Sequence, residues 1–304
     1  MTAPEESPWT GRKVLVTGAA GFIGSRLSLR LTALGAQVHG VSRRKIADDT
    51  CVWHTADLTD AEGTTELVRS VRPDVVFHLA AEVNGSRGTE TLVPTLTNTV
   101  VGSVNLLNAA HGLGARVVMA GSVEEARPEL GETLTSSPYA VARWAATGYA
   151  RLFHQLWDLP VTVLRISMVY GPGQPDTTKV VPYVAQCLLR GEEPSLTAGK
   201  RRMDWVYVDD VAEALVLAAE RENAVGRVFD IGTGDGIAVR DIVTRLYELA
   251  GSTATPPFGT RPERVMDVER FAHVEEAADV LGWRATTPVD EGLRRTLEWY
   301  GRRL

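Results

Sequence analysis

The chain has 304 residues, of which 44% are hydrophobic and 23% are charged, and its formal net charge is −6. This composition is typical of a globular protein and excludes a fibre or a disordered chain, and no apolar run approaches the roughly 20 residues that span a bilayer. We therefore expect no membrane anchor, and because the chain is acidic overall we expect no nucleic-acid partner.

The N-terminal segment, residues 1–11, is polar and has no basic-then-apolar signal pattern, so we expect a flexible tail and a cytoplasmic protein. After it, short β-branched runs alternate with amphipathic stretches, which predicts an α/β fold with a doubly wound parallel sheet. The predicted strands are Lys13–Thr17, Gln37–Ser42, Val75–Leu79, Arg116–Ala120 and Val161–Ile166. The predicted helices lie near residues 22–34, 59–71, 91–113 and 139–158.

The character of the chain changes after Tyr170, where loops, shorter helices and several prolines follow. We therefore predict a first domain made mainly of residues 12–170 and a smaller C-terminal α/β domain made mainly of residues 171–304, interwoven with the first. The two cysteines, Cys51 and Cys187, are far apart and lack metal-ligand spacing, so we expect two reduced thiols and no metal site.

A glycine-rich turn, residues 17–24, follows the first predicted strand and opens the first predicted helix. Gly18 permits a tight turn, Gly21 lets backbone N–H groups approach a pyrophosphate, and Gly24 permits close packing of helix on strand. The start of a helix also favours phosphate charge, so this context predicts a dinucleotide-binding turn rather than a chance glycine-rich loop. The residues predicted to hold the pyrophosphate are Gly18, Ala20, Gly21, Phe22 and Ile23.

The end of the second predicted strand indicates which dinucleotide binds. A carboxylate there would accept hydrogen bonds from the ribose hydroxyls and repel a 2′-phosphate, but this chain has Ser42, Arg43 and Arg44 instead. A hydroxyl and guanidinium groups suit a phosphate, so we expect NADP(H) in preference to NAD(H). The alternative is an ordinary solvated basic turn. Asp57, after the next short strand, is a candidate for the adenine edge, although a helix N-cap is a competing interpretation.

At this point the sequence resembles the extended short-chain dehydrogenase/reductase family, which contains nucleotide-sugar epimerases, dehydratases and ketoreductases. The motifs that carry the resemblance are Thr17–Gly24, His78–Ala81, Asn98, Asn105–Leu107, Gly121-Ser122, Pro138-Tyr139, Val169–Gly173, Asp204–Asp210 and Leu281–Trp283. The resemblance implies a Rossmann-type sheet with a substrate-binding C-terminal domain, a nicotinamide cofactor, a nucleoside-diphosphate sugar as substrate and a homodimer through the helices near 91–113 and 139–158. It also implies that the cofactor contacts Leu58, Leu79, Ala80 and Ala81.

Reduction of a sugar ketone needs a proton donor, a second group that polarises the carbonyl and a nearby cation. By the resemblance, Tyr139 donates the proton and Ser122, just past the fourth predicted strand, polarises the oxygen. The family has Tyr-x-x-x-Lys where this chain has Arg143 in the lysine position. One helical turn still places that charge beside Tyr139, where it favours the tyrosinate and can contact the cofactor ribose, but an arginine fork has a different geometry.

Two further polar residues are candidates near the reacting centre. Asn98 orders the site by resemblance, although a helix-start role is an alternative. Glu124 follows Ser122 closely, as a proton-transferring carboxylate does in the family's dehydratases. Reductases with a similar Ser-x-Glu-Glu run also occur in the family, and Glu124 and Glu125 could form an enolising pair or a solvated turn, so dehydration does not follow.

The substrate diphosphate needs arginine or lysine side chains. Arg261 matches the family's phosphate arginine, and Lys179, Arg201 and Arg202 lie in the same region of the sequence. The family often has Asn where Met168 stands and Arg where Met203 stands, and Arg202 is the candidate to replace the second. The loop expected to face the sugar, with a plain surface loop as alternative, contains Glu82, Val83 and Asn84.

The first hypothesis is therefore an NADP(H)-dependent oxidoreductase that reduces the 4-keto group of a nucleoside-diphosphate 4-keto-6-deoxy sugar. Because the same residues can run the reaction backwards, a C4-epimerase or 4,6-dehydratase that retains its cofactor is the close alternative. Arg143 suggests a third possibility, an NADP(H)-binding protein with little or no activity.

Overall fold

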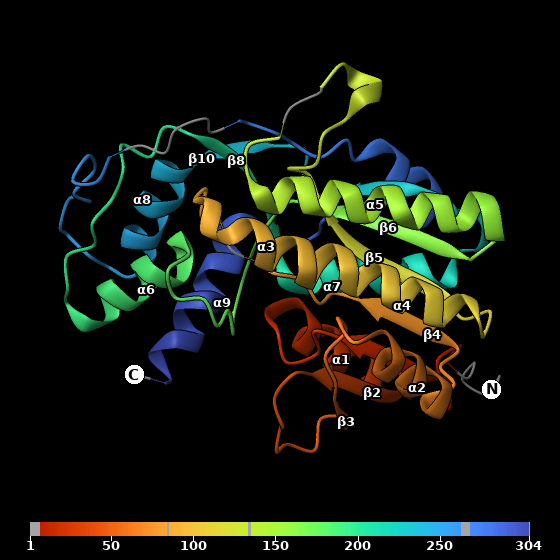
Figure 1. Ribbon diagram of the computed structural model, residues 1–304. Coiled ribbons are helices and arrows are strands. Elements are labelled where there is room, and N and C mark those ends of the chain that lie inside the picture. Colours follow the sequence, from red (N-terminus) through yellow and green to blue (C-terminus); the bar gives the residue numbers. More distant parts are fainter. Residues whose placement is uncertain (1–6, 84, 133–134, 263–267, 304) are drawn as a thin grey trace.

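The computed structural model describes residues 7–83, 85–132, 135–262 and 268–303. Seven parallel strands form one sheet in the order β3-β2-β1-β4-β5-β6-β9, which confirms the predicted doubly wound fold (Figure 1). The strands are β1 (Lys13–Thr17), β2 (Gln37–Ser42), β3 (Val52–Thr55), β4 (Val75–His78), β5 (Arg116–Ser122), β6 (Val161–Ile166) and β9 (Val228–Ile231).

Helices cover both faces of this sheet because alternate strand residues face opposite ways. In β1, Val14 and Val16 belong to one buried apolar cluster, whereas Leu15 belongs to the other. The first cluster includes residues of α1 (Phe22–Ala33) and α7 (Val208–Glu220). The second includes residues of α2 (Ala61–Val71), α4 (Gly102–His111) and α5 (Pro138–Trp157).

The element boundaries refine the predictions at two places that matter for function. Strand β5 extends to Ser122, so this residue is the last of its strand and does not lie past it. The helix expected near 91–113 is not one regular helix: α3 (Leu92–Thr95) leads through a π-helical turn, Leu96–Val101, into α4. Such π-helical turns often mark functional sites.

The expected flexible tail ends earlier than predicted, because Trp9 belongs to the core. Its side chain is fully buried, its ring centre lies 6.1 Å from that of Phe77, and its indole N–H donates to the Glu220 carboxylate at 2.5 Å. Glu220 lies at the end of α7, more than 200 residues away in sequence. Residues 7–11 therefore close one end of the core beside the sheet.

A second lobe has its own sheet, in the order β10-β8-β7, and its own apolar core around Tyr170, Trp205 and Leu246. Its elements are β7 (Met168–Tyr170), α6 (Val180–Arg190), β8 (Arg202–Tyr207), β10 (Gly236–Ala238), α8 (Val239–Leu249) and α9 (Val289–Gly301). Strand β9 and α7 come from the same half of the chain, but β9 is part of the large sheet and α7 packs in the apolar cluster on one of its faces. Within the described ranges, no helix has the length and apolar character needed to cross a bilayer.

Candidate active site

The glycine turn packs so closely that two of its positions have no room for a side chain. Gly18 has a φ of +70°, and a Cβ atom there would lie 2.9 Å from the backbone nitrogen of Ala80. A Cβ atom on Gly24 would overlap the carbonyl oxygen of Gly18. Gly24 therefore lets the helix pack closely against the preceding turn, as the sequence predicted.

The start of α1 fits the diphosphate of a dinucleotide. Gly21 is its N-cap in extended conformation, no side chain caps the helix, and its first turn has no acidic residue. The first N–H groups of a helix lack intrahelical partners and carry the positive end of its dipole. This end of α1 can thus bind an anionic group through backbone donors alone.

A buried chain of hydrogen bonds holds the glycine turn to the neighbouring strand and helix. His78 Nδ1 lies 2.8 Å from Thr17 Oγ1, and its Nε2 lies 2.8 Å from Ser103 Oγ. Since the Ser103 hydroxyl donates to the Thr99 carbonyl, its oxygen accepts from His78 Nε2–H; Thr17 then donates to Nδ1 and accepts from the Ala80 N–H. Burial lowers the pKa of His78 to about 3, so the ring stays neutral. Each hydrogen bond in this series therefore keeps the same donor and the same acceptor.

The predicted phosphate-binding turn lies at the end of β2. The Ser42 hydroxyl oxygen accepts the Arg44 N–H at 3.1 Å, which closes the turn. Arg43 and Arg44 are both exposed. Their guanidinium groups are therefore accessible to a phosphate group from solvent.

Asp57 lies at the same end of the sheet. Its carboxylate accepts the backbone N–H of Thr59 at 3.0 Å and the Thr59 hydroxyl at 2.8 Å, and these bonds, followed by the charge of Arg43, lower the pKa of Asp57. The N-cap of α2 is Asp60, which accepts the Gly63 N–H. Asp57 is thus not the cap of this helix, and the competing interpretation as an N-cap is wrong.

The loop after Asp57 is held by a residue that we did not single out as functional. Asn105 on α4 donates to the carbonyl oxygens of Leu58 at 2.9 Å and Thr59 at 3.2 Å. Leu58 is buried in the core beneath α4. The sequence signal for this residue was its place in the Asn105–Leu107 motif of the family resemblance, which did not indicate what its side chain contacts.

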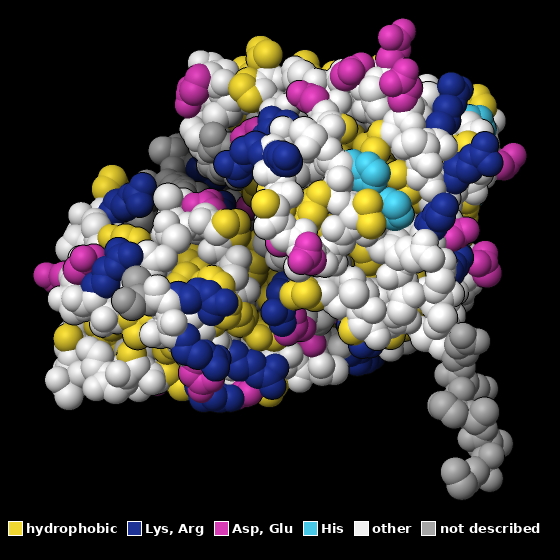
Figure 2. All heavy atoms as spheres, turned by 90° about the horizontal axis from the view of Figure 1, so that it is seen from below, with side chains coloured by type: hydrophobic (Ala, Val, Ile, Leu, Met, Phe, Trp, Pro, Cys, Tyr) yellow, Lys and Arg dark blue, Asp and Glu magenta, His cyan; other side chains and the backbone are white. Residues whose placement is uncertain are grey.

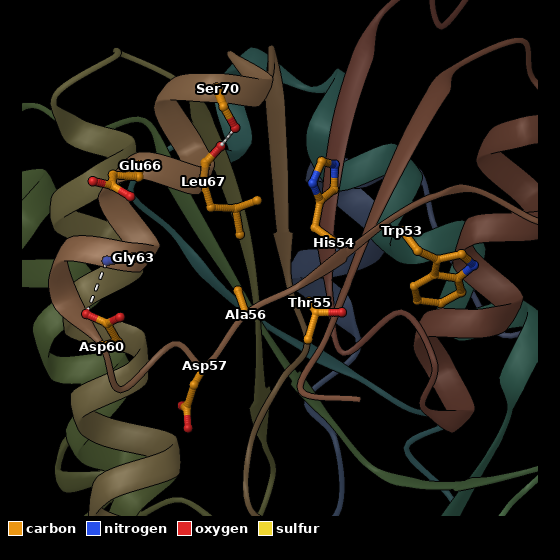
Figure 3. A pocket seen from close by; sticks show the side chains of 10 residues that line it. All are labelled: Trp53, His54, Thr55, Ala56, Asp57, Asp60, Gly63, Glu66, Leu67 and Ser70. Carbon is orange, nitrogen blue, oxygen red and sulfur yellow. Dashed lines mark hydrogen bonds between the residues drawn. The ribbon is translucent and has the colours of Figure 1, made fainter. Parts of the chain in front are cut away.

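A cavity of 720 Å³ lies beside β3 and α2 (Figure 3). Its lining residues are Trp53, His54, Thr55, Ala56, Asp57, Asp60, Gly63, Glu66, Leu67 and Ser70. Only Asp57 belongs to the candidate residues, and neither the glycine turn nor Ser122 contributes to the wall. This cavity is therefore not where the candidate catalytic side chains converge.

Ser122 sits in a tight turn that engages most of its polar groups. Its N–H donates to the Glu125 carboxylate at 2.7 Å, its carbonyl accepts the Glu125 N–H at 3.0 Å, and its hydroxyl oxygen accepts the Glu124 N–H at 3.2 Å. The hydroxyl hydrogen has no acceptor among these contacts. Ser122 can therefore donate a hydrogen bond to a substrate oxygen at the carboxyl end of β5.

Tyr139 and Arg143 lie at the start of α5. Ser137 caps this helix by accepting the Ala140 N–H, and Tyr139 follows in the first turn. Arg143 is 5% exposed, its guanidinium carbon lies 5.6 Å from the centre of the Tyr139 ring, and its Nη1 donates to the Ala120 carbonyl at 2.5 Å. Arg143 thus links α5 to β5 and places a positive charge beside Tyr139.

The π-helical turn brings Asn98 to the loop after β4. Its side-chain amide donates to the Glu82 carboxylate at 3.0 Å, and the adjacent Thr99 hydroxyl accepts the Glu82 N–H at 3.1 Å. Glu82 is thereby held beside Asn98. Val83 is exposed, and Asn84 lies outside the described residues.

Glu124 contacts the second lobe. One of its carboxylate oxygens lies 3.4 Å from Arg201 Nη2, which also donates to the Val268 carbonyl at 3.1 Å. Arg202, the predicted phosphate ligand, instead donates through Nε and Nη2 to the Gly236 carbonyl of β10. The structure therefore brings Arg201, and not Arg202, to the turn that contains Ser122.

The remaining predicted phosphate ligands lie on the second lobe. Lys179 is the N-cap of α6, with its Nζ 3.8 Å from the Asp176 carboxylate. Arg261 is exposed, and its backbone N–H donates to the Leu196 carbonyl. Neither cation contacts Ser122, Tyr139 or Arg143 in the described residues.

Buried ion pairs lie beside the Ser122 turn at the β6 and β9 side of the large sheet, and the sequence did not predict them. Arg127 and Arg165 both pair with Asp230, at 3.1 and 2.7 Å, and all three side chains are at most 15% exposed. Arg127 also donates to the Phe271 carbonyl, and Asp230 accepts the His273 N–H. The segment from Val268 to His273 is thus tied to the large sheet from several sides.

The lower face of the molecule is hollowed between its two lobes (Figure 2). Apolar side chains show inside the hollow, and Lys and Arg side chains gather beside it. An apolar recess with basic groups at its edge suits an anionic ligand that has a hydrophobic part.

Comparison with known proteins gives consistent matches. A model described as the NAD dependent epimerase/dehydratase family matches residues 14–232. The UDP-glucose 4-epimerase of Mycolicibacterium smegmatis is 32% identical, with 95% of this chain and 98% of that relative covered. The dTDP-glucose 4,6-dehydratase of Streptomyces antibioticus is 31% identical, with 94% and 92% covered. The crystal structure of Thermus thermophilus UDP-glucose 4-epimerase in complex with NAD has a TM-score of 0.85 at 29% identity, with 95% and 98% covered.

Proposed function

Because this chain belongs to the NAD-dependent epimerase/dehydratase family, we propose that it reduces the 4-keto group of a nucleoside-diphosphate 4-keto-6-deoxy sugar with NADPH. The membership confirms the resemblance to the extended short-chain dehydrogenase/reductase family. It also makes the chain a member of an enzyme family that acts on nucleotide sugars. The reduction and the choice of NADPH are our proposals within that family.

The basic turn after β2 carries the proposal. Ser42, Arg43 and Arg44 offer a hydroxyl and two accessible guanidinium groups where a carboxylate would disfavour a 2′-phosphate. In a reductase the oxidised cofactor dissociates and is replaced by free NADPH. In an epimerase or dehydratase the cofactor stays bound and is regenerated in each reaction. The Thermus relative is described with NAD, so cofactor choice distinguishes our proposal from that relative.

The mechanism assigns one task to each side chain around the carbonyl. The start of α1 and the Ser42–Arg44 turn would hold NADPH, which would supply the hydride for the new C–H bond at C4 and would be oxidised to NADP⁺. Tyr139 gives its phenolic proton to the carbonyl oxygen, which becomes a hydroxyl, and regains a proton from solvent. Ser122 donates a hydrogen bond to the same oxygen, and Arg143 stabilises the negative charge on Tyr139 after the transfer.

The carboxylates near Ser122 support reduction over dehydration. Removal of water needs groups that take and return protons at neighbouring carbons. Glu124 is held by Arg201, and Glu125 is buried and accepts the Ser122 N–H. The two acids therefore do not form a pair directed at one substrate. A C4-epimerase is the second candidate, because the Mycolicibacterium relative is named as one.

A turnover assay tests the function. The protein is incubated with NADPH or NADH and a panel of nucleoside-diphosphate 4-keto-6-deoxy sugars, and cofactor oxidation is followed together with the sugar product. We expect stoichiometric NADPH oxidation and a 4-hydroxy product. Interconversion of 4-hydroxy epimers without net cofactor oxidation would establish the epimerase instead, and cofactor binding with no turnover on any sugar would leave a binding protein.

Removal of the basic side chains after β2 should weaken the binding of NADPH but not that of NADH. We expect Arg43→Ala combined with Arg44→Ala to raise the NADPH Kd about 10- to 100-fold, because two charge-assisted contacts to the 2′-phosphate are lost. The NADH Kd should change little. Fluorescence titration with both cofactors measures this, with Arg190→Ala, an exposed arginine of α6, as control. Equal weakening of both cofactors would contradict the NADP(H) assignment.

We further propose a homodimer through the outer face of α3 and α5. Exposed apolar residues follow one stripe of α5, and others extend it over α3 and the π-helical turn; they are Leu92, Val93, Leu96, Val141, Trp144, Leu152 and Leu156. Gly148 lies within the stripe with open space around it, which permits close helix approach. A continuous row of exposed apolar side chains on neighbouring helices is typical of a protein–protein interface.

Sedimentation tests the dimer. The 33.0 kDa chain should sediment as a species of twice that mass, about 66 kDa. Replacement of Trp144 and Leu152 by Glu should give monomers, because each charge would be buried in the interface. Leu189→Glu, which alters an exposed leucine on α6, is the control and should remain dimeric. A monomeric unaltered protein would remove the proposal.

A further inference from the structure

The turn after β5 contains a buried carboxylate that the mechanism does not use. Glu125 is 1% exposed, whereas its neighbour Glu124 is partly exposed and pairs with Arg201. One oxygen of the Glu125 carboxylate accepts the backbone N–H of Ser122 at 2.7 Å. A buried carboxylate is costly unless its surroundings compensate for the lost water, so its retention at this position calls for a role.

The missing side chain of Gly121 creates the space for this carboxylate. A Cβ atom on Gly121 would lie 2.5 Å from Glu125 Oε1. The carboxylate therefore lies directly over the backbone of β5, on the face that α5 covers, and Thr147 of α5 is next to it. Gly121 and Glu125 thus fit each other, and the fit brings the carboxylate to the residue that the mechanism requires.

The charges around Glu125 come from three sides. Burial raises the pKa of Glu125, whereas the hydrogen bond from the Ser122 amide and the charges of Arg165 on β6 and Arg143 on α5 act in the opposite direction. Arg270 donates to the backbone carbonyls of Glu124 and Glu125 from the second lobe. The Ser122 amide thus holds one oxygen of the Glu125 carboxylate, and Arg270 holds the Glu125 backbone.

We propose that Glu125 is a positioning residue for Ser122. Its carboxylate, seated over Gly121, holds the Ser122 amide, and the same turn orients the Ser122 hydroxyl through the Glu124 N–H. The reach of the side chain is what matters, because the acceptor oxygen must span from residue 125 back to the amide of residue 122. The inference deepens the proposed function, and it rests on that function only for the catalytic use of Ser122.

Two conservative substitutions separate reach from charge. Glu125→Gln keeps the acceptor oxygen at the same reach and removes the charge, whereas Glu125→Asp keeps the charge and shortens the side chain. We expect kcat within about threefold of the unaltered protein for Gln and roughly 10- to 100-fold lower for Asp, with an unchanged sugar KM. Amide hydrogen exchange resolved to Ser122 should become at least about tenfold faster in the Asp variant only.

A matched control and a second variant keep the outcome decisive. Asp210→Ala removes another buried carboxylate that accepts a backbone N–H, that of Thr287, and should lower Tm without changing Ser122 exchange. Gly121→Ala displaces the Glu125 carboxylate without altering it and should reproduce the Asp phenotype if Glu125→Asp does not fold.

Similar effects of Gln and Asp, or unchanged Ser122 exchange in the Asp and Gly121→Ala variants, would overturn the proposal. Hydrogen exchange needs no substrate. If no sugar is reduced, the proposed function fails, while the exchange data still decide whether Glu125 holds Ser122.

Discussion

Tyr139→Phe should lower kcat by about 10²- to 10⁴-fold while leaving NADPH affinity unchanged. The substitution removes only the phenolic oxygen, and with it the proton that neutralises the carbonyl oxygen as hydride reaches C4. The ring remains in the first turn of α5, where the guanidinium carbon of Arg143 lies 5.6 Å from the ring centre. The variant should therefore fold normally and bind cofactor.

The measurement is steady-state NADPH oxidation at saturating cofactor, together with fluorescence titration of NADPH. Tyr149→Phe is the matched control, because Tyr149 lies on the same helix and is exposed at its surface. We expect the control to retain full kcat. A Tyr139→Phe variant with more than a tenth of the original kcat would show that another group donates the proton.

The sheet and the glycine turn could be predicted because their signals are local. Strands β1, β2 and β6 have the predicted bounds, since short β-branched runs between turn residues determine them. The role of Gly24 was predictable for the same reason. The first turn of α1 packs directly against the glycine turn that precedes it, and only glycine leaves room for this contact.

The burial of Trp9 could not be predicted from local sequence signals. Its partners Phe77 and Glu220 are distant in sequence, and nothing in residues 1–11 indicates that they pack together. A polar segment with one tryptophan is compatible with a tail and with a core anchor. Only the tertiary fold decides between the two.

The site shows the same limit at the level of single side chains. Glu124 and Glu125 are adjacent and chemically alike, yet one pairs with Arg201 on the second lobe and the other is buried over Gly121. The pairing of β8 with β10 likewise directs Arg202 toward Gly236 and leaves Arg201 near Glu124. Residue types and spacing predict that acids and arginines gather there, but strand pairing and packing determine which of them meet.

The arginine that replaces the family's lysine gives the second large expected effect. Arg143→Met should lower kcat/KM by about 10²- to 10³-fold, because it removes the positive charge beside Tyr139 and leaves the buried Ala120 carbonyl without its donor. Arg143→Lys keeps a charge on the same turn of α5, but an ammonium group cannot reproduce the planar fork that links α5 to β5. We expect the Lys variant to retain kcat/KM within about tenfold.

Steady-state kinetics with thermal unfolding separates the two roles of Arg143. Loss of the Ala120 contact should lower stability by about 1–3 kcal/mol in the Met variant, whereas loss of the charge should appear in kcat/KM beyond any change in folded fraction. Arg151→Met, on an exposed arginine two turns further along α5, should change neither quantity. The opposite result would be equally informative: if the unaltered protein binds NADPH without turnover and Arg143→Lys creates activity, the arginine suppresses catalysis. The native chain would then be a cofactor-binding protein that keeps the fold and most of the site of its family but has lost the reaction.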